Sequence, residues 1–451
     1  MPTLSRILLS ASLLGLAAFS LAAPLAQRIL SVDADGRPME GGPSPEAVVK
    51  GFRKSGARTL LLHFHGGLVD AEQGLIQARH MDANVYRDPE TFPAYVVWNS
   101  GWGDVVQSLR SEPGVFQNMF SPGVRPYEVR LPHLEAIRRT RHYVDSVRSE
   151  GRVPVDVEAE LRDYYRRNIR GLEEEDILTL AAAMKGWTTE ALGWSRTNPL
   201  VTPQTPDVRK VEMQYGFLIR SGWDEMKRYI DGSNEITWGA TNRMIQALRT
   251  DPPERIVLVG HSAGAIYATR FLRRAAERLP GTRFDVLYLE PAITYHEMAE
   301  AVPLYRARVD HFRMFAMDDA TARRNSVLNE LGVIDSLDRS IGRGRFSRLY
   351  PGSLLYVVSN ILEGDADTPM IALQRFRMPD LPLTESERQD RTTVDSYLDW
   401  TRDVAWSHGG VGPPDPRPGY ATQATQHGGI WREPVTNGSM VKTLEQWATG
   451  S

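Results

Sequence analysis

The chain of 451 residues contains no cysteine. This absence excludes a thiol nucleophile, thiolate metal ligands, disulfide bonds and a lipid-modified N-terminal cysteine. The sequence also has no large excess of charge of either sign, because 53 Lys and Arg residues nearly balance 56 Asp and Glu residues, and it has no long basic run. Nucleic acid is therefore not an expected partner. Hydrophobic residues at 41% and charged residues at 24% are typical of a globular enzyme with a large core.

Metal-binding patterns are missing as well. The sequence has no HExxH motif or comparable cluster. His63 and His65 alternate on a predicted strand and so share one face, but a zinc site needs a third ligand and an open position. The pattern favours buried histidines over metal ligands, and we expect no metal or other cofactor.

A long hydrophobic run occurs at the start of the chain. Residues 1–6 carry one positive side chain, residues 7–22 are apolar and uncharged, and this stretch ends in Ser20-Leu21-Ala22. The pattern predicts a secretory signal peptide over residues 1–22 and a secreted or periplasmic protein. The stretch is short for a membrane span and Pro24 follows it, which disfavours an uncleaved anchor. A mis-assigned start or a buried N-terminal helix are the other interpretations.

The most informative motif is Gly260-His261-Ser262-Ala263-Gly264. It follows an apolar run at 256–259 and precedes a helix-like segment at 265–279. A serine flanked by two glycines between a strand and a helix predicts a nucleophile elbow. Both flanking positions must be glycine because a Cβ at either would collide with a neighbouring strand or helix. The alternative is an ordinary strand-turn-helix with a capping serine.

Strand-like and helix-like segments alternate around this motif. The expected strands are 59–64, 94–98, 256–259, 284–289 and 311–317, with 28–32 as a further candidate. Helix-like segments at 71–86, around 238–248 and at 265–279 lie between them. This alternation predicts an α/β fold with a mostly parallel sheet covered by helices on both faces.

The alternation stops between about residues 107 and 235, where the sequence becomes charged and helix-like. We expect a helical cap inserted into the sheet domain. Aromatic side chains of this segment could line a substrate pocket, although aromatics at helical spacing are usually core residues. They include Tyr164, Tyr165, Trp187, Trp194 and Trp223.

From about residue 59 to the C-terminus, the cap excepted, the chain resembles the α/β-hydrolase superfamily, in its lipase and esterase-like branch. The resemblance implies a role for His65-Gly66-Gly67, which follows the strand 59–64. The backbone N–H of Gly67 would be one donor to an oxyanion, and the N–H of Ala263, directly after the nucleophile, would be the second. Two fixed donors stabilise a developing alkoxide with little reorganisation. A plain glycine turn is the alternative at residues 66 and 67.

A serine nucleophile needs a base, and the superfamily places its residues in the chain order serine, acid, histidine. Four histidines follow Ser262: His296, His311, His408 and His427. His408 and His427 both precede a Gly-Gly pair. We predict His427 as the base, with His408 as the alternative. An amphipathic segment follows His427, as the terminal helix follows the histidine loop in relatives, whereas prolines follow His408.

The acid should lie at the carboxyl end of a strand between Ser262 and the histidine. Asp318-Asp319 follows the strand 311–317, the position that most relatives use. Glu290-Pro291-Ala292 follows the strand 284–289 and resembles the acid-Pro-Ala of some animal lipases. We predict Asp319, with Asp318 and Glu290 as alternatives.

These residues together predict a serine hydrolase that cleaves carboxylic esters of small molecules or lipids through an acyl-enzyme on Ser262. An amidase or a thioesterase would use the same residues. The alternative from another class is an inactive hydrolase fold kept as a binding module. A lipase acting at a membrane surface is a further possibility, although the sequence lacks a basic amphipathic anchor.

Overall fold

The computed structural model describes residues 23–67, 71–98, 223–325 and 383–449, together with parts of 131–188 and 352–381. The segment predicted to be a signal peptide, residues 1–22, lies outside the described residues. None of the helices in the described part of the chain is long and apolar enough to span a membrane.

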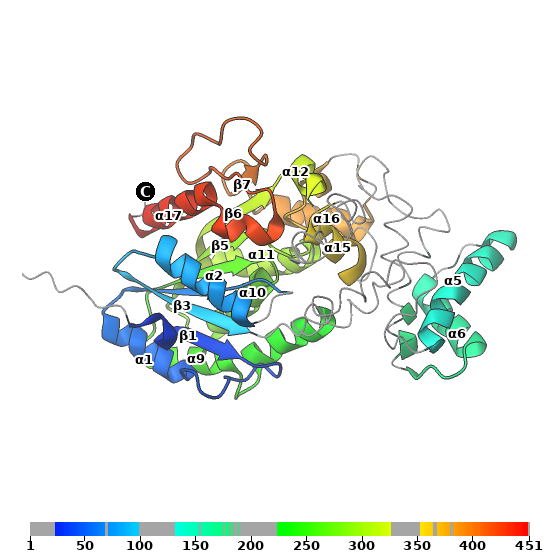
Figure 1. Cartoon of the computed structure of the whole chain (residues 1–451), viewed down its shortest axis with the longest axis horizontal. Coiled ribbons are helices and arrows are strands. Elements are labelled where there is room, and N and C mark those ends of the chain that lie inside the picture. Colours follow the sequence, from blue (N-terminus) through cyan, green and yellow to red (C-terminus); the bar gives the residue numbers. More distant parts are fainter. Residues whose placement is uncertain are drawn as a thin grey trace, which may run out of the picture.

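A seven-stranded, all-parallel sheet forms the centre of the molecule (Figure 1), which confirms the α/β prediction. The strand order is β1-β3-β2-β4-β5-β6-β7. The strands are β1 (Ile29–Val32), β2 (Thr59–Phe64), β3 (Thr91–Trp98), β4 (Arg255–His261), β5 (Arg283–Leu289), β6 (Val309–Met317) and β7 (Val404–Ser407). The sequence did not indicate β7, since four residues are too few to show a period.

The order of the elements follows the predicted alternation of strands and helices. The longer helices are α1 (Pro45–Ser55), α2 (Ala71–Asn84), α5 (Leu131–Ser149), α6 (Val157–Asn168), α9 (Ala240–Leu248), α10 (Gly264–Arg278), α11 (Tyr295–Arg308), α16 (Glu385–Asp395) and α17 (Pro434–Thr449). Shorter helical turns are η1 (Leu25–Gln27), α12 (Asp319–Arg324), α15 (Leu354–Val357), η2 (Val358–Leu362), η3 (Gln374–Arg377) and η4 (His427–Arg432).

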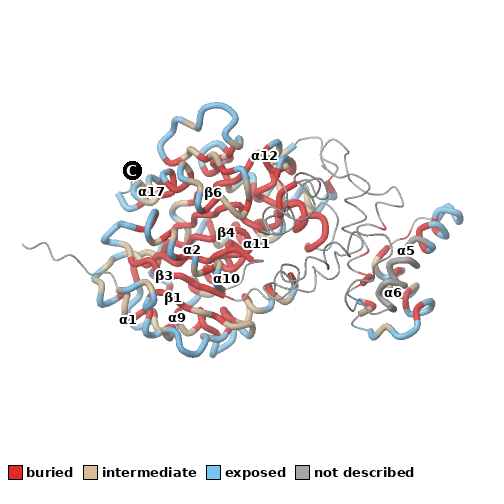
Figure 2. The backbone as a smooth tube through the Cα atoms, viewed as in Figure 1, coloured by how far each residue is buried: buried red, intermediate tan, exposed pale blue. Residues whose placement is uncertain are grey.

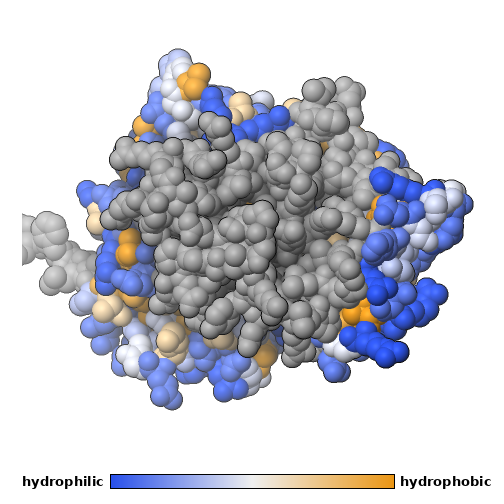
Figure 3. Space-filling model, turned by 45° about the vertical axis from the view of Figure 1, so that its right-hand side comes forward, coloured by the Kyte–Doolittle hydropathy of each residue, from blue (hydrophilic) through white to orange (hydrophobic). Residues whose placement is uncertain are grey.

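Helices cover both faces of the sheet because successive strand residues point to opposite sides. Leu60, Leu62 and Phe64 of β2 belong to a core that α1, α9, α10 and α11 cover. Leu61, between them, belongs to a second core beneath α2 and α17. Figure 2 shows the strands as the buried centre of this arrangement. The described surface in Figure 3 is mostly hydrophilic, with isolated hydrophobic spots.

The chain leaves the sheet after β3 and returns with a helix over residues 223–235. Between them, α5 and α6 pack on each other through a separate apolar cluster, and they lie apart from the sheet in Figure 1. These helices fall within the predicted cap, whereas its segments 107–130 and 189–222 lie outside the described residues. The assignment of residues 107–235 as a cap stays a prediction.

Two glycines bring α10 unusually close to the sheet. An ideal Cβ on Gly260 would lie 2.6 Å from the Cα of Ala265, and one on Gly264 would overlap the carbonyl groups of Phe64 and His65. These neighbours are backbone atoms, which cannot turn aside as a flexible side chain can. The start of α10 therefore lies against the ends of β2 and β4 only because both positions are glycine.

We predict that Gly260→Ala lowers the free energy of unfolding by about 1–3 kcal/mol, the usual cost of overpacking, because the added methyl group meets backbone. The matched control is Gly281→Ala, where an added Cβ meets no atom within 4 Å. That variant should stay within about 0.5 kcal/mol of the wild type. Urea unfolding measures both, and equal stabilities would contradict the close approach at Gly260.

Candidate active site

The carboxyl ends of β2, β4 and β5 lie side by side. In the parallel register Gly260 of β4 is opposite Phe64 of β2, and His261 is opposite Leu289 of β5. The residues that follow these strands, 65–67, Ser262 and Glu290, consequently emerge at one edge of the sheet. Sheets of this kind usually place their functional groups at that edge.

Ser262 and Glu290 share an uncommon backbone conformation. Their φ angles are 53° and 45°, and no other non-glycine residue in the described part of the chain has a positive φ. Side chains rarely adopt this left-handed region. Hydrogen bonds hold both turns, from Ser262 N to Leu289 O at 3.0 Å and from Glu290 N to Phe315 O at 2.8 Å. Local strain at two neighbouring positions is typical of functional sites.

His427 reaches the serine from the far end of the chain. Its Nε2 lies 2.8 Å from Ser262 Oγ, and both residues are buried. His427 begins η4, and its backbone carbonyl accepts a hydrogen bond from His261 Nε2 at 3.1 Å. The Glu433 carboxylate, at the start of α17, accepts hydrogen bonds from the N–H groups of Val435 and Thr436 at 2.9 and 2.7 Å. The histidine is thus bonded to the elbow through both its ring and its carbonyl, and η4 leads from it into the capped start of α17.

Glu290 is the carboxylate behind His427. Its Oε2 lies 3.6 Å from His427 Nδ1, and both side chains are almost completely buried. Its Oε1 accepts a hydrogen bond from the backbone N–H of Met317, at the end of β6. The Glu290 side chain is therefore held between the ends of two strands while facing the imidazole.

The prediction of Asp319 as the acid is not supported by this geometry. Asp319 accepts a hydrogen bond from the Tyr356 hydroxyl at 2.8 Å and pairs with Arg323 at 2.7 Å. The reason lies in the strand order, since β5 is next to β4 whereas β6 is one strand further away. Glu290, at the end of the nearer strand, takes the place beside His427.

The other predicted candidates lie elsewhere. Asp318 accepts from Thr321 N at the start of α12 and pairs with His408 at 2.7 Å, so the two rejected alternatives bind each other. His296 pairs with Asp390 at 3.1 Å, and His311 pairs with Asp285 at 2.8 Å. The sequence signal that could have identified Glu290 was the acid-Pro-Ala pattern directly after the strand next to the elbow.

The predicted oxyanion loop lies against the elbow. An ideal Cβ on Gly66 would be 3.2 Å from Ser262 Cβ, and one on Gly67 would be 3.0 Å from Ala263 Cβ. His65 holds the loop in place. Its Nδ1 donates to Gly66 O at 2.7 Å, and its Nε2 accepts from Trp98 N at 3.0 Å. Residues 65–67 and Ala263 are thus brought together, as the resemblance implied, and their role as oxyanion donors stays a prediction.

Sequence analysis did not anticipate the contact of Met226 with this loop. Met226 lies in the helix over residues 223–235, and its sulfur would be 2.7 Å from a Cβ on Gly67. The neighbouring Lys227 pairs with Glu363 at 2.6 Å and with Glu297 at 3.2 Å. These ion pairs fix the end of the predicted cap beside Gly67, and no local sequence pattern reports such a long-range contact.

Two aromatic residues of the predicted cap, Trp223 and Tyr165, are core residues, whereas Tyr164 is partly buried against the α5–α6 cluster. Trp223 is buried and donates to Glu363 at 2.8 Å, and Tyr165 packs inside the α5–α6 cluster. Trp187 and Trp194 lie outside the described residues.

Three more histidines are buried around the site. His63 Nδ1 contacts the Tyr86 hydroxyl at 2.8 Å, and burial together with nearby His65 lowers the pKa of His63 from 6.5 to about 3. Burial and neighbouring His427 also hold the pKa of His261 well below its usual value. The rings of His63 and His261 are therefore neutral at pH 7. Within the described ranges, no group of three His, Asp or Glu side chains could hold a metal ion.

Comparisons of the chain with protein-family models, with curated proteins and with solved structures found no match.

We predict that the buried histidines make the protein lose stability in acid. Between pH 6.5 and about 3 the unfolded chain binds a proton at His63 that the folded chain does not bind. The free energy of unfolding therefore falls with decreasing pH in this window, by up to about 1.4 kcal/mol per pH unit for this residue. His63→Asn should reduce the slope measured by urea unfolding between pH 6 and 4 by that amount.

His142 provides the control, because it lies exposed on α5. His142→Asn should leave the slope unchanged. Equal slopes for His63→Asn and the wild type would show that His63 does not remain neutral in the folded protein.

Proposed function

We propose that this chain is a serine hydrolase of the α/β-hydrolase superfamily that cleaves carboxylic esters. One observation carries the proposal: His427 Nε2 lies 2.8 Å from the hydroxyl of Ser262, with the buried Glu290 carboxylate on the other side of the ring. The chain order Ser262, Glu290, His427 is the order of that superfamily. The turn at Ser262, with its positive φ between Gly260 and Gly264, fits a nucleophile elbow.

Each of these groups has a role in acyl transfer. Ser262 Oγ would attack the ester carbonyl carbon while His427 Nε2 accepts the hydroxyl proton. Glu290 would orient the imidazole with its proton on Nδ1 and stabilise the imidazolium that forms. The separation of 3.6 Å between Glu290 and His427 is longer than a hydrogen bond, as catalytic contacts often are before substrate binds.

The remaining steps restore the enzyme. The carbonyl oxygen would become an oxyanion that the N–H groups of Gly67 and Ala263 stabilise. Collapse of this intermediate breaks the ester C–O bond, and the proton on His427 passes to the leaving alcohol. Water, deprotonated by His427, then attacks the acyl-enzyme, which releases the carboxylic acid and regenerates Ser262.

We predict that the wild-type protein hydrolyses nitrophenyl esters and is labelled by a fluorophosphonate probe at Ser262 alone. Ser262→Ala should abolish the labelling and lower hydrolysis by about 10⁴-fold or more, because no other activated serine replaces the nucleophile. Mass spectrometry locates the label and a spectrophotometric assay follows turnover. Absence of both labelling and turnover in the wild type would favour a binding module, and hydrolysis of amides or thioesters instead of esters would revise the substrate class.

A second prediction separates the two carboxylates. Glu290→Gln should reduce kcat by about 10²–10⁴-fold, because the amide cannot stabilise the imidazolium. Asp319→Asn is the matched control and should reduce kcat by less than about threefold, since Asp319 contacts Tyr356 and Arg323 instead of His427.

The two histidines give a parallel pair. His427→Ala should be as severe as Glu290→Gln, whereas His408→Ala should retain most of the activity because His408 pairs with Asp318. An inactive Asp319→Asn or His408→Ala variant with native stability would contradict the assignment.

A further inference from the structure

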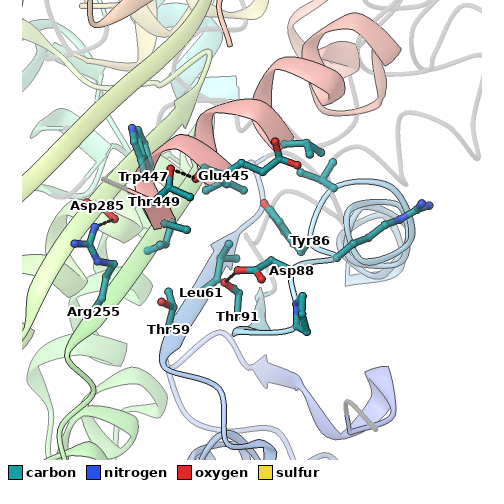
Figure 4. Close-up of a pocket in the computed structure, with 17 residues that line it drawn as sticks. Thr59, Leu61, Tyr86, Asp88, Thr91, Arg255, Asp285, Glu445, Trp447 and Thr449 are labelled. Atoms are coloured by element: carbon teal, nitrogen blue, oxygen red, sulfur yellow. Dashed lines mark hydrogen bonds and ion pairs between the residues drawn. The ribbon is translucent and has the colours of Figure 1, made fainter. Parts of the chain in front are cut away.

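Two cavities open on either side of Trp447, near the amino ends of β4, β5 and β6 and thus at the opposite end of the sheet from Ser262. The first, of 430 Å³, lies between the start of β2 and α17 (Figure 4). Its wall is largely apolar. The charged residues at one side of it, Arg255 and Asp285, pair with each other at 2.6 Å, so they offer no unsatisfied charge to a ligand.

The second cavity, of 510 Å³, is more polar and contains Arg313. It lies between the start of β6, residues 397–403, Tyr420 and the end of α17. Its lining has both basic and acidic groups. The polar residues are Asp310, His311, Arg313, Tyr397, Arg402, Asp403, Tyr420 and Gln446. Arg313 is 7% exposed, which makes it nine-tenths buried.

The acidic residues around this cavity already have basic partners. Asp403 pairs with Arg402 at 3.0 Å, and Asp285 pairs with Arg255. Asp310 pairs with Arg283, and on the outer side Asp415 pairs with Arg417 at 2.6 Å.

Arg313 is left without a carboxylate in ion-pair contact in the described part of the chain. Its Nη1 donates to the carbonyl of Gly419 at 3.3 Å, and its guanidinium lies 3.6 Å from the centroid of the Tyr420 ring. Its Nε has no hydrogen-bond partner. A buried charge with so few partners is costly, and an anion is the partner that would offset the cost most directly.

We propose that this cavity is a second ligand site, which binds a small anion through a carboxylate or phosphate group held by Arg313. The guanidinium fork matches either group with two parallel hydrogen bonds. Arg402, which is paired with Asp403, and Gln446 line the same cavity and carry further N–H donors. The site is separate from the proposed hydrolase site and does not depend on that proposal.

Calorimetric titration of the full chain tests this proposal, with inorganic phosphate in one experiment and succinate in another. Both use Tris–chloride at constant ionic strength. We expect the wild type to bind at least one of the two anions with one site per chain. Binding of phosphate alone, of succinate alone or of both identifies the group that the site prefers. A weak specific site would still be filled at an anion concentration of about 20 mM. Failure of both anions to bind at concentrations up to that value would therefore overturn the proposal.

Two arginine variants provide the matched comparison, since Arg313 and Arg417 both contact the Tyr420 ring, at 3.6 and 3.9 Å. Arg313→Met keeps the apolar stem and should weaken binding at least tenfold. Arg417→Met should bind within about twofold of the wild type, because Arg417 is paired with Asp415. Equal affinities for wild type and Arg313→Met would overturn the proposal.

The conservative variant resolves the case in which Arg313→Met does not fold. Arg313→Lys keeps the charge but loses the fork, so it should bind the anion at least threefold more weakly than Arg417→Lys. Thermal unfolding without added anion separates a site from a purely structural contact. If Arg313 is an uncompensated buried charge, its removal should leave the melting temperature of Arg313→Met equal to or higher than that of the wild type. If Arg313 makes only structural contacts, the melting temperature should fall. A lower melting temperature together with unchanged anion affinity would count against the site.

Discussion

The close approach of α10 to the ends of β2 and β4 is the constraint on which the proposed active site depends. Because Gly260 and Gly264 lack a Cβ, the backbone at the start of α10 can approach the backbone at the ends of β2 and β4 more closely than any other residue would allow. The chain must therefore turn sharply at Ser262, which takes a positive φ and is tied back to Leu289 of the neighbouring strand. Serine, helix and the loop after β2 are consequently fixed relative to one another before any distant residue joins them.

The carboxylate beside His427 follows from the same register. Because β5 pairs directly with β4, the residue after β5 comes closest to the elbow, and Glu290 takes a left-handed conformation there. Its side chain is also bound to the end of β6 through Met317 N–H. One strand further on, Asp318 and Asp319 lie at the start of α12 and bind partners of their own.

The two ends of the sheet differ in the charged and polar side chains that lie there. At the carboxyl end, the buried carboxylate of Glu290 and the buried imidazoles of His427 and His261 lie close to Ser262. At the amino end, arginine–aspartate pairs line the sheet. The nearby carboxylates are paired with other arginines, so the charge of Arg313 has no ion-pair partner among the described residues. A single parallel sheet thus separates two polar environments by the length of its strands.

The sequence alone determined the α/β class, most of the strands and the position of the elbow serine, because these depend on local period and on glycines at fixed spacing. It also indicated His427, whose loop precedes a terminal amphipathic helix. Tertiary structure decided that Glu290 and not Asp319 lies beside His427, because that placement depends on which strand lies next to β4, and the order of strands in a sheet is not encoded locally. It likewise decided that Met226 lies on Gly67 and that Arg313 has no carboxylate partner among the described residues. Both are contacts between segments far apart in the chain, which only the packed sheet brings together.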